Sequence, residues 1–202
     1  MVKVKICGIT NLEDARAAIE SGADTLGFVF ARSPRQVTPE QAGHIVTQLP
    51  PFVCKVGVFV DSDIEVIREI MSVCGLDLAQ LHGSEDPDYC KMLFPHAIKS
   101  FRVRDESVLA TIPQYKASAY LLDSYDTNLR GGTGQSFNWD IAKKAKRYGP
   151  IILAGGLTAD NVRQAIATVQ PYAVDVSSGV EAAPGKKDHA KLRTFLEAVK
   201  KQ

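Results

Sequence analysis

The 202-residue chain lacks long hydrophobic runs and lacks an excess of charge of either sign. No apolar stretch approaches the roughly 20 residues that a membrane-spanning helix needs. The 24 basic and 23 acidic residues nearly cancel, and the basic residues form no run longer than a pair. This balance argues against a protein that binds nucleic acid or a charged membrane surface.

Cysteine and histidine are also scarce, with four residues of each. Cys7, Cys54, Cys74 and Cys90 lack the close spacing of metal ligands and fit a reducing compartment. The scattered histidines give no reason to expect a metal site. The chain opens with Met1-Val2-Lys3 and leads straight into a predicted strand, so we expect no secretory signal. We therefore predict a cytoplasmic protein without a metal.

Eight short β-rich segments recur along the chain, and segments of helical periodicity separate most of them. This alternation is typical of parallel strands joined by helical crossovers, and eight such units in a chain of this length favour a closed (β/α)8, or TIM, barrel. No composition break divides the chain, which predicts a single domain over residues 1–202. The predicted strands are Val2–Cys7, Thr25–Phe30, Val53–Val60, Asp77–Leu81, Ala97–Phe101, Ala119–Asp123, Pro150–Ala154 and Ala173–Ser177.

An open, doubly wound sheet is the competing fold. Such a sheet normally carries a glycine fingerprint after its first strand. The segment Cys7-Gly8-Ile9-Thr10-Asn11 does not match that fingerprint, so the barrel is favoured.

Several helix starts are marked by their sequence. Residues 10–13, 38–41 and 62–65 each pair Ser or Thr with Glu or Gln three positions later, which is the capping-box pattern. Pro39 occupies the first helical position of the second of these. After the seventh strand, Thr158 is the predicted start of the next helix.

Cys7 and Asp123 are the candidate catalytic residues. Side chains alternate along a strand, so Lys5 and Cys7 both point into the barrel, and Cys7 lies at its C-terminal mouth. Active sites of such barrels lie at this mouth. The Lys5 cation should favour a Cys7 thiolate. Asp123 ends the sixth strand, and a thiolate base facing a carboxylic acid forms an acid–base pair for moving protons on a small molecule.

Two glycine-containing turns predict a phosphate site. Gly155-Gly156 follows the seventh strand, and Ser177-Ser178-Gly179 follows the eighth. In barrels these two loops form the usual phosphate site, because glycine lets backbone N–H groups reach the anion. Either turn alone would be explained by its need for glycine, but both occur at the expected strand ends.

Other polar residues are candidate substrate ligands. Arg35 follows the second strand and could clamp a carboxylate, although a solvated surface arginine is an equal alternative. Lys5 of the first strand and Asp175 of the eighth share the inward parity and are further candidates. Gln80 and His82 share the inward parity of the fourth strand, where a satisfied polar core pair is the alternative. Residues 124–138 form a long glycine-rich segment, and structureless loops of this length are usually functional.

The ordered set of motifs resembles the phosphoribosylanthranilate isomerase family of tryptophan biosynthesis, from Met1 to the last helix. The motifs are Lys5-Ile6-Cys7-Gly8-Ile9-Thr10, Gly27-Phe28-Val29-Phe30, Ser33-Pro34-Arg35, Gln80-Leu81-His82-Gly83, Leu122-Asp123, Gly131-Gly132-x-Gly134-x-x-Phe137-x-Trp139, Gly155-Gly156-Leu157 and Asp175-Val176-Ser177-Ser178-Gly179-Val180-Glu181.

This resemblance implies a barrel enzyme that performs an Amadori rearrangement without a cofactor. The implied substrate is N-(5-phosphoribosyl)anthranilate, and the product is 1-(2-carboxyphenylamino)-1-deoxyribulose 5-phosphate. Asp123 would protonate the furanose ring oxygen and open the ring to a Schiff base. Cys7 would then remove the proton from sugar C2, giving an enolamine that tautomerises to the ketose.

Three other functions stay open. A sister sugar isomerase of histidine synthesis resembles this layout, but with an aspartate where Cys7 stands. A lyase that uses Lys5 as a Schiff-base nucleophile is chemically feasible, and so is a phosphate-binding sensor with an inactive site. The expected partner is a small phosphoribosyl substrate, and the chain would be a monomer or a homodimer. The apolar loop Pro50-Pro51-Phe52 is either a dimer patch or a rigid connection.

Overall fold

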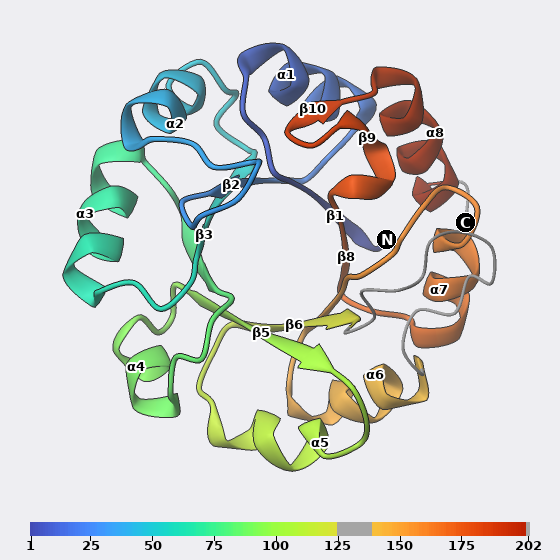
Figure 1. The fold of residues 1–202 in the computed structure, drawn as a ribbon. Helices are drawn as coiled ribbons and strands as arrows, with labels where there is room; N and C mark the ends of the chain where they lie inside the picture. The colour runs from blue at the N-terminus through green and yellow to red at the C-terminus, as the bar shows by residue number, and fades with distance from the viewer. Residues whose placement is uncertain (125–138, 201–202) are drawn as a thin grey trace.

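The computed structural model describes residues 1–124 and 139–200. Eight parallel strands pair in chain order, and the first pairs with the last, so the sheet closes into a barrel (Figure 1). This closure confirms the predicted (β/α)8 barrel and rules out the open sheet. The strands are β1 (Lys3–Cys7), β2 (Thr25–Val29), β3 (Cys54–Phe59), β4 (Leu78–Leu81), β5 (Ala97–Val103), β6 (Ala119–Ser124), β7 (Ile151–Leu153) and β8 (Ala173–Val176).

Helices surround the barrel as an outer ring (Figure 1). The helix between β5 and β6 is short and continues as a 3₁₀ turn, in keeping with its weak helical pattern. The helices are α1 (Leu12–Ser21), α2 (Pro39–Val46), α3 (Ile64–Cys74), α4 (Pro87–Met92), α5 (Val108–Thr111), α6 (Trp139–Ala145), α7 (Val162–Val169) and α8 (His189–Lys200), and the 3₁₀ turns are η1 (Ile112–Gln114), η2 (Lys146–Tyr148) and η3 (Ser178–Val180).

The strand register sets which side chains face the barrel interior. Along β1, Val4 and Ile6 belong to the apolar cluster that also contains Ala15 of α1 and Leu192 of α8. Lys5, between them, pairs with Asp175 inside the barrel. The alternation along β1 therefore follows the sequence prediction, and the interior receives the polar side chains.

A smaller apolar cluster fills the lower part of the barrel interior. It combines side chains from several strands, including Val56, Ile98, Leu121 and Ile152. Layers of this kind make the barrel a packed core with its polar residues above, at the carboxyl ends of the strands. Each predicted strand end agrees with the structure within two residues.

The helix starts follow the sequence prediction in one of four places. The capping box of α2 is present, with the Thr38 hydroxyl accepting from the backbone N–H of Gln41 and the Gln41 side chain accepting from that of Thr38. The predicted box at 10–13 is wrong. Asn11 caps α1 instead, because its side chain accepts from Asp14 N–H at 2.8 Å while the Thr10 hydroxyl donates to Gly185.

The other two starts are displaced along the chain. Helix α3 begins after Asp63 without a side-chain cap, so the box predicted at 62–65 is wrong, and the Ser62 hydroxyl donates to the carbonyl of Val60. Helix α7 begins at Val162 rather than at Thr158. The residues between form a turn in which the Asn161 side chain accepts from the Thr158 N–H.

A short hairpin that the sequence did not predict follows β8. Its strands are β9 (Glu181–Ala183) and β10 (Lys186–Lys187), which pair antiparallel. Figure 1 shows this hairpin at the mouth, beside α1 and α8. The hydrogen bond from Thr10 to Gly185 joins it to the loop after β1. The hairpin therefore lies over the strand end that carries Cys7.

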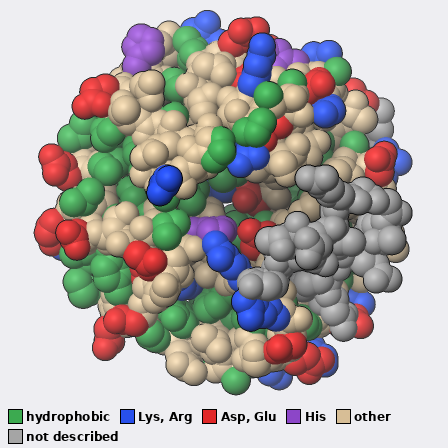
Figure 2. All heavy atoms as spheres, viewed as in Figure 1, with side chains coloured by type: hydrophobic (Ala, Val, Ile, Leu, Met, Phe, Trp, Pro, Cys, Tyr) green, Lys and Arg blue, Asp and Glu red, His purple; other side chains and the backbone are tan. Residues whose placement is uncertain are grey.

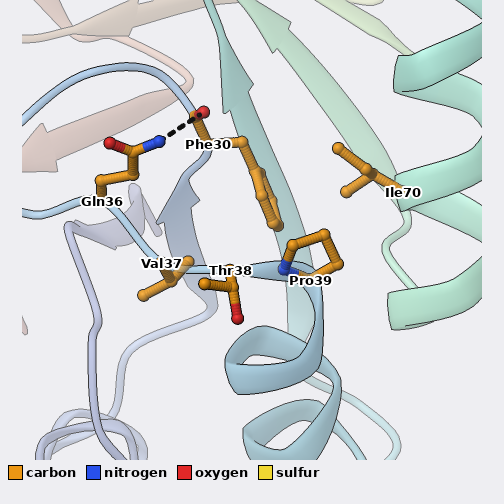
Figure 3. A pocket seen from close by; sticks show the side chains of 6 residues that line it. All are labelled: Phe30, Gln36, Val37, Thr38, Pro39 and Ile70. Carbon is orange, nitrogen blue, oxygen red and sulfur yellow. Dashed lines mark hydrogen bonds between the residues drawn. The ribbon is translucent and has the colours of Figure 1, made fainter.

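Two further features lie away from the barrel interior. Within residues 1–124 and 139–200, no helix combines the length and apolar character needed to cross a membrane. An outer groove of about 390 Å³ lies between the loop after β2 and helix α3, and Figure 3 shows Phe30, Pro39 and Ile70 lining it. The Gln36 side-chain amide donates to the carbonyl of Phe30 there, at 3.4 Å. None of the predicted site residues lines this groove.

Candidate active site

Charged and polar side chains gather at the centre of the mouth. Figure 2 shows basic, acidic and histidine side chains around a hollow on this face. The predicted inward residues Lys5, Cys7, Gln80, His82 and Asp175 interact there with one another or with neighbouring polar groups. The apolar cluster in the barrel interior, which includes Val56 and Leu121, lies below them. The mouth is thus a polar cavity above a closed core, as expected for a barrel active site.

Cys7 lies at the end of β1, next to a buried ion pair. The Lys5 ammonium donates to Asp175 Oδ1 at 2.9 Å, and both side chains are at most one-tenth exposed. Burial lowers the pKa of Lys5, but the charges of Asp175 and Cys7 outweigh it, so the pKa lies above its usual value. Lys5 therefore stays a cation beneath the thiol.

The thiol of Cys7 does not ionise as easily as the sequence suggested. Burial raises its pKa, and the Asp175 carboxylate raises it further. The cations Lys5 and Lys187 lower it, as predicted for Lys5, but the net shift is upward. Cys7 is a free thiol that is 9% exposed. It is therefore a strong base once ionised, but a minor fraction ionises at neutral pH.

Asp123 and His82 face one another across the mouth. His82 Nε2 lies 3.7 Å from Asp123 Oδ2, and both side chains are partly exposed. Gln80 Nε2 lies 3.0 Å from His82 Nδ1. Burial lowers the pKa of His82, and the Lys5 charge adds to this effect. A neutral imidazole whose Nδ1 accepts from Gln80 carries its proton on Nε2, toward Asp123.

The two loops of the predicted phosphate site lie against one another. Gly155 and Gly156 both have positive φ, at 85° and 64°, and a Cβ at Gly156 would meet no atom within 4 Å. A Cβ at Gly179 would come 2.0 Å from the carbonyl oxygen of Leu157, so only glycine allows this contact between the loops. The Asn161 side chain donates to the Gly156 carbonyl at 2.9 Å. These contacts fix an open, glycine-lined turn.

The loop after β8 adds hydroxyl groups to this turn. Ser178 begins the 3₁₀ turn η3, and Ser177 precedes it. Ser177 Oγ is buried, and the part of the chain that the structure describes offers it no hydrogen-bond partner. A buried hydroxyl of this kind is costly unless a ligand satisfies it. The same loop reaches Arg35, because Ser177 Oγ and the Arg35 side chain both lie within 3.4 Å of the Cβ position of Gly8.

Arg35 is held at the rim by a carboxylate. Its Nε donates to Glu181 Oε1 at 2.8 Å, and its Nη2 donates to Glu181 Oε2 at 2.6 Å. The Arg35 side chain is 23% exposed, and the Glu181 hydrogen bonds raise its pKa. Arg35 is therefore not a solvated surface residue. Its bonds to Glu181 use two of the five guanidinium N–H donors, which leaves three that could bind a ligand.

A comparison with protein families shows which family the chain belongs to. The family model described as "N-(5'phosphoribosyl)anthranilate (PRA) isomerase" matches residues 4–198. The chain belongs to the phosphoribosylanthranilate isomerase family. An N-(5'-phosphoribosyl)anthranilate isomerase of Pelobacter propionicus is 57% identical over 201 residues, which cover 99% of this chain and 96% of that protein.

Solved structures of this family share the fold. A phosphoribosyl anthranilate isomerase in complex with reduced 1-(o-carboxyphenylamino)-1-deoxyribulose 5-phosphate is 41% identical, with a TM-score of 0.88 and full coverage of both chains. Monomers generated from a dimeric phosphoribosylanthranilate isomerase of Thermotoga maritima are likewise 41% identical, with a TM-score of 0.88 and full coverage of both chains. The barrel and its strand order are therefore those of the family.

Some polar residues of the mouth escaped the sequence analysis. Glu181 and Lys187 form a buried pair at 2.9 Å on the β9–β10 hairpin. Lys99 and Glu85 form another at 2.7 Å, and the Lys99 ammonium also donates to the carbonyl of Gly83. Glu181 was named only within the family motif after the eighth strand, and Lys99 lies inside β5, so neither position identified a partner far away in the chain.

Across the described ranges, no three side chains of His, Cys, Asp or Glu come together in a way that could hold a metal ion. The glycine motif Gly131-Gly132-Thr133-Gly134 and the neighbouring Phe137 lie outside the described residues. Trp139, the last residue of that family motif, begins α6.

Proposed function

We propose that the chain converts N-(5-phosphoribosyl)anthranilate to 1-(2-carboxyphenylamino)-1-deoxyribulose 5-phosphate, an aldose–ketose step of tryptophan biosynthesis. Membership of the isomerase family supports this assignment. So does the ligand of the related complex, a reduced form of the product. The observation that carries the proposal is the Cys7 thiol beside the buried Lys5–Asp175 pair, facing the same mouth as Asp123.

The first chemical step assigns the role of general acid to Asp123. Its proton passes to the furanose ring oxygen, the bond between that oxygen and sugar C1 breaks, and the nitrogen lone pair forms the Schiff base. The neutral His82, 3.7 Å from Asp123, lies where it can contact the same substrate oxygen or the carboxyl group. Donation by a positioned acid contributes typically 10²–10⁴-fold to such a step.

The second step assigns the role of general base to Cys7. The thiolate takes the proton from sugar C2, and the electrons of that C–H bond form the C1–C2 double bond while the nitrogen becomes neutral. The enolamine then loses its C2 hydroxyl proton and gains one at C1, which gives the ketose. Burial makes the thiolate a strong base but a minor species at neutral pH, and the Lys5 and Lys187 cations, which lower the pKa of Cys7, support its ionisation.

Substrate binding would divide between the two sides of the mouth. The phosphate would lie on the loops after β7 and β8, at Gly155, Gly156, Ser177, Ser178 and Gly179, where open space and the unpaired Ser177 hydroxyl support an anion site. The anthranilate carboxylate would meet Arg35. Gln80 is the candidate ligand of the sugar hydroxyls, since its buried Oε1 lacks a partner among residues 1–124 and 139–200.

The proposal is tested by mixing the enzyme with N-(5-phosphoribosyl)anthranilate and following the loss of the fluorescence of this substrate. Product analysis must show the ribulose phosphate in equal amount. The control is Lys3→Met, because Lys3 is exposed at the opposite end of β1. No catalysed loss with wild-type protein would refute the function.

The Schiff-base lyase is the weakest alternative. A lysine nucleophile must be a neutral amine, whereas Lys5 is held as a cation against Asp175. Borohydride added with substrate would trap Lys5 covalently if the lyase mechanism operated. We expect no such adduct.

The remaining properties follow from the same assignment. We propose that residues 1–202 act as one catalytic domain, since the barrel strands run from Lys3 to Val176. We expect a cytoplasmic enzyme that needs no cofactor and that is a monomer or a homodimer. The Phe52 side chain is 99% exposed in the loop before β3, which supports the dimer patch over a purely rigid connection. Sedimentation of wild type and Phe52→Ser tests this patch. A wild-type dimer that becomes a monomer in Phe52→Ser would support it, and identical sedimentation of the two proteins would contradict it.

A further inference from the structure

A buried lysine on the β9–β10 hairpin lies directly behind the candidate base. The side chain of Lys187 is fully buried. Its ammonium donates to the carbonyl oxygen of Cys7 at 2.6 Å and to Glu181 Oε1 at 2.9 Å, and lies 3.5 Å from the carbonyl oxygen of Ser177. An ammonium has three N–H donors. All three point at the ends of β1 and β8 and at Glu181, so one side chain joins the base to the phosphate loop.

Glu181 extends this set of contacts to Arg35. Its two carboxylate oxygens accept from Nε and Nη2 of Arg35, and Oε1 also accepts from Lys187. Burial raises the pKa of Glu181, but the hydrogen bonds from Arg35 and Lys187 outweigh it and keep the pKa below its usual value. The carboxylate therefore stays charged between two cations. Arg35, Glu181 and Lys187 thus form a continuous series of hydrogen bonds, and the last of these reaches the backbone carbonyl of Cys7.

We propose that Lys187 and Glu181 are positioning residues for the isomerase reaction. Lys187 fixes the main chain of Cys7 relative to Ser177, and Glu181 fixes the Arg35 guanidinium at the rim. The inference rests on the proposed function, because it takes Cys7 as the base and Arg35 as the carboxylate ligand. The side chains of Lys187 and Glu181 would then fix the positions of Cys7, Arg35 and the phosphate loop relative to one another.

The charge of this pair argues for such a role. A buried ion pair contributes less to stability than apolar residues of similar volume would, since both charges lose their hydration. Burial lowers the pKa of Lys187, which shows the cost, and Glu181 only partly offsets it. An apolar contact could close the hairpin, but it could not hold two strand-end carbonyl oxygens. The directed N–H groups of Lys187 are what the ion pair adds.

The first test is Lys187→Met, with Lys186→Met as its matched control. Lys186 is the exposed neighbour on β10. Small misplacement of a catalytic group can cost on the order of 10²-fold in rate, so we expect kcat to fall about ten- to a hundredfold with little change in KM. The control should keep both constants. Unchanged kcat in a folded Lys187→Met protein would overturn the proposal for Lys187.

The second readout does not need turnover. The rate of iodoacetamide labelling of Cys7 against pH, measured on the Cys7 peptide by mass spectrometry, gives the ionisation midpoint of the thiol. The charged groups that face Cys7 are Lys5, Asp175, Arg35 and Lys187. Loss of the Lys187 cation should move the midpoint upward. A residue that only stabilised the hairpin would lower the melting temperature and leave the midpoint unchanged, which would also overturn the proposal.

The third variant, Glu181→Gln, tests the contact with Arg35 separately from the contact between Lys187 and Cys7. Glu181→Gln has one acceptor oxygen, so it cannot accept from Arg35 through two oxygens and from Lys187 as well. We expect KM to rise more than kcat falls, because the carboxylate ligand loses its anchor. If Lys187→Met does not fold, this variant decides, and an unchanged KM overturns the inference. A wild-type protein without isomerase activity would instead refute the function, while the Cys7 labelling would still test its link to Lys187.

Discussion

The buried Lys5–Asp175 pair gives the sharpest prediction for mutagenesis. The two charges are 2.9 Å apart with side chains 3% and 10% exposed, so loss of one leaves the other inside the barrel. Breaking a buried pair in this way costs about 3–5 kcal/mol. We expect Lys5→Met and Asp175→Asn each to lower the free energy of unfolding by about that amount. The double variant should lose less than the sum, because no unpaired charge remains.

The same variants should move the ionisation of Cys7 in opposite directions. Lys5 lowers the pKa of Cys7 and Asp175 raises it. The pH midpoint of iodoacetamide labelling of Cys7 reports this ionisation without turnover. This midpoint should therefore shift to higher pH in Lys5→Met and to lower pH in Asp175→Asn. Stability alone would not give shifts of opposite sign.

Urea unfolding, followed by circular dichroism and by fluorescence, measures the first effect. The two probes must agree before the free energies are compared. Lys3→Met is the control, because its ion pair with Asp24 is exposed, and it should leave the stability nearly unchanged. Additive losses in the double variant, or labelling midpoints that shift in the same direction, would refute this account of the pair.

The remaining predictions concern the rim, the phosphate loops and the base. Arg35→Ala removes a charge-assisted contact worth roughly 1.5–3 kcal/mol, so kcat/KM should fall about ten- to a hundredfold, and Arg35→Lys should recover only part. Unchanged kcat/KM would place the carboxylate ligand elsewhere. Inorganic phosphate should inhibit competitively, and Gly156→Asp should raise KM because it places like charge in the open turn. Non-competitive inhibition would contradict that site. In wild type, the pH midpoint of Cys7 labelling by iodoacetamide should lie above the usual thiol value of ~8.5, since burial raises the pKa of Cys7, and a midpoint below pH 7 would contradict this upward shift.

The sequence predicts the fold and the inward side chains because both depend on local periodicity. Alternation along β1 correctly placed Lys5 and Cys7 inside the barrel, and the strand ends follow from β-rich runs bounded by turns. The capping box of α2 is local in the same sense, since Thr38 and Gln41 satisfy one another. Strand alternation and turn-bounded β-rich runs are therefore the local patterns that held, whereas only one of the three predicted capping boxes forms.

The contacts that escaped prediction join residues far apart in the chain. Thr10 failed as a helix cap because its hydroxyl bonds to Gly185, 175 residues away. Arg35 pairs with Glu181, 146 residues away, and Lys187 reaches the backbone of Cys7. The upward shift in the pKa of Cys7 likewise depends on burial, which Lys5 alone does not reveal. These features arise only when the barrel closes.

The most direct test of the central claim is a single-turnover experiment with wild type, Cys7→Ser and Asp123→Asn. Enzyme in excess over N-(5-phosphoribosyl)anthranilate isolates the chemical steps, and substrate binding is measured separately by fluorescence titration. Serine stays protonated near pH 7 and asparagine has no proton to transfer, so each variant should react at least about 10²–10⁴-fold more slowly while substrate affinity changes little. A folded Cys7→Ser or Asp123→Asn protein that turns over substrate at the wild-type rate would contradict the proposed acid–base pair.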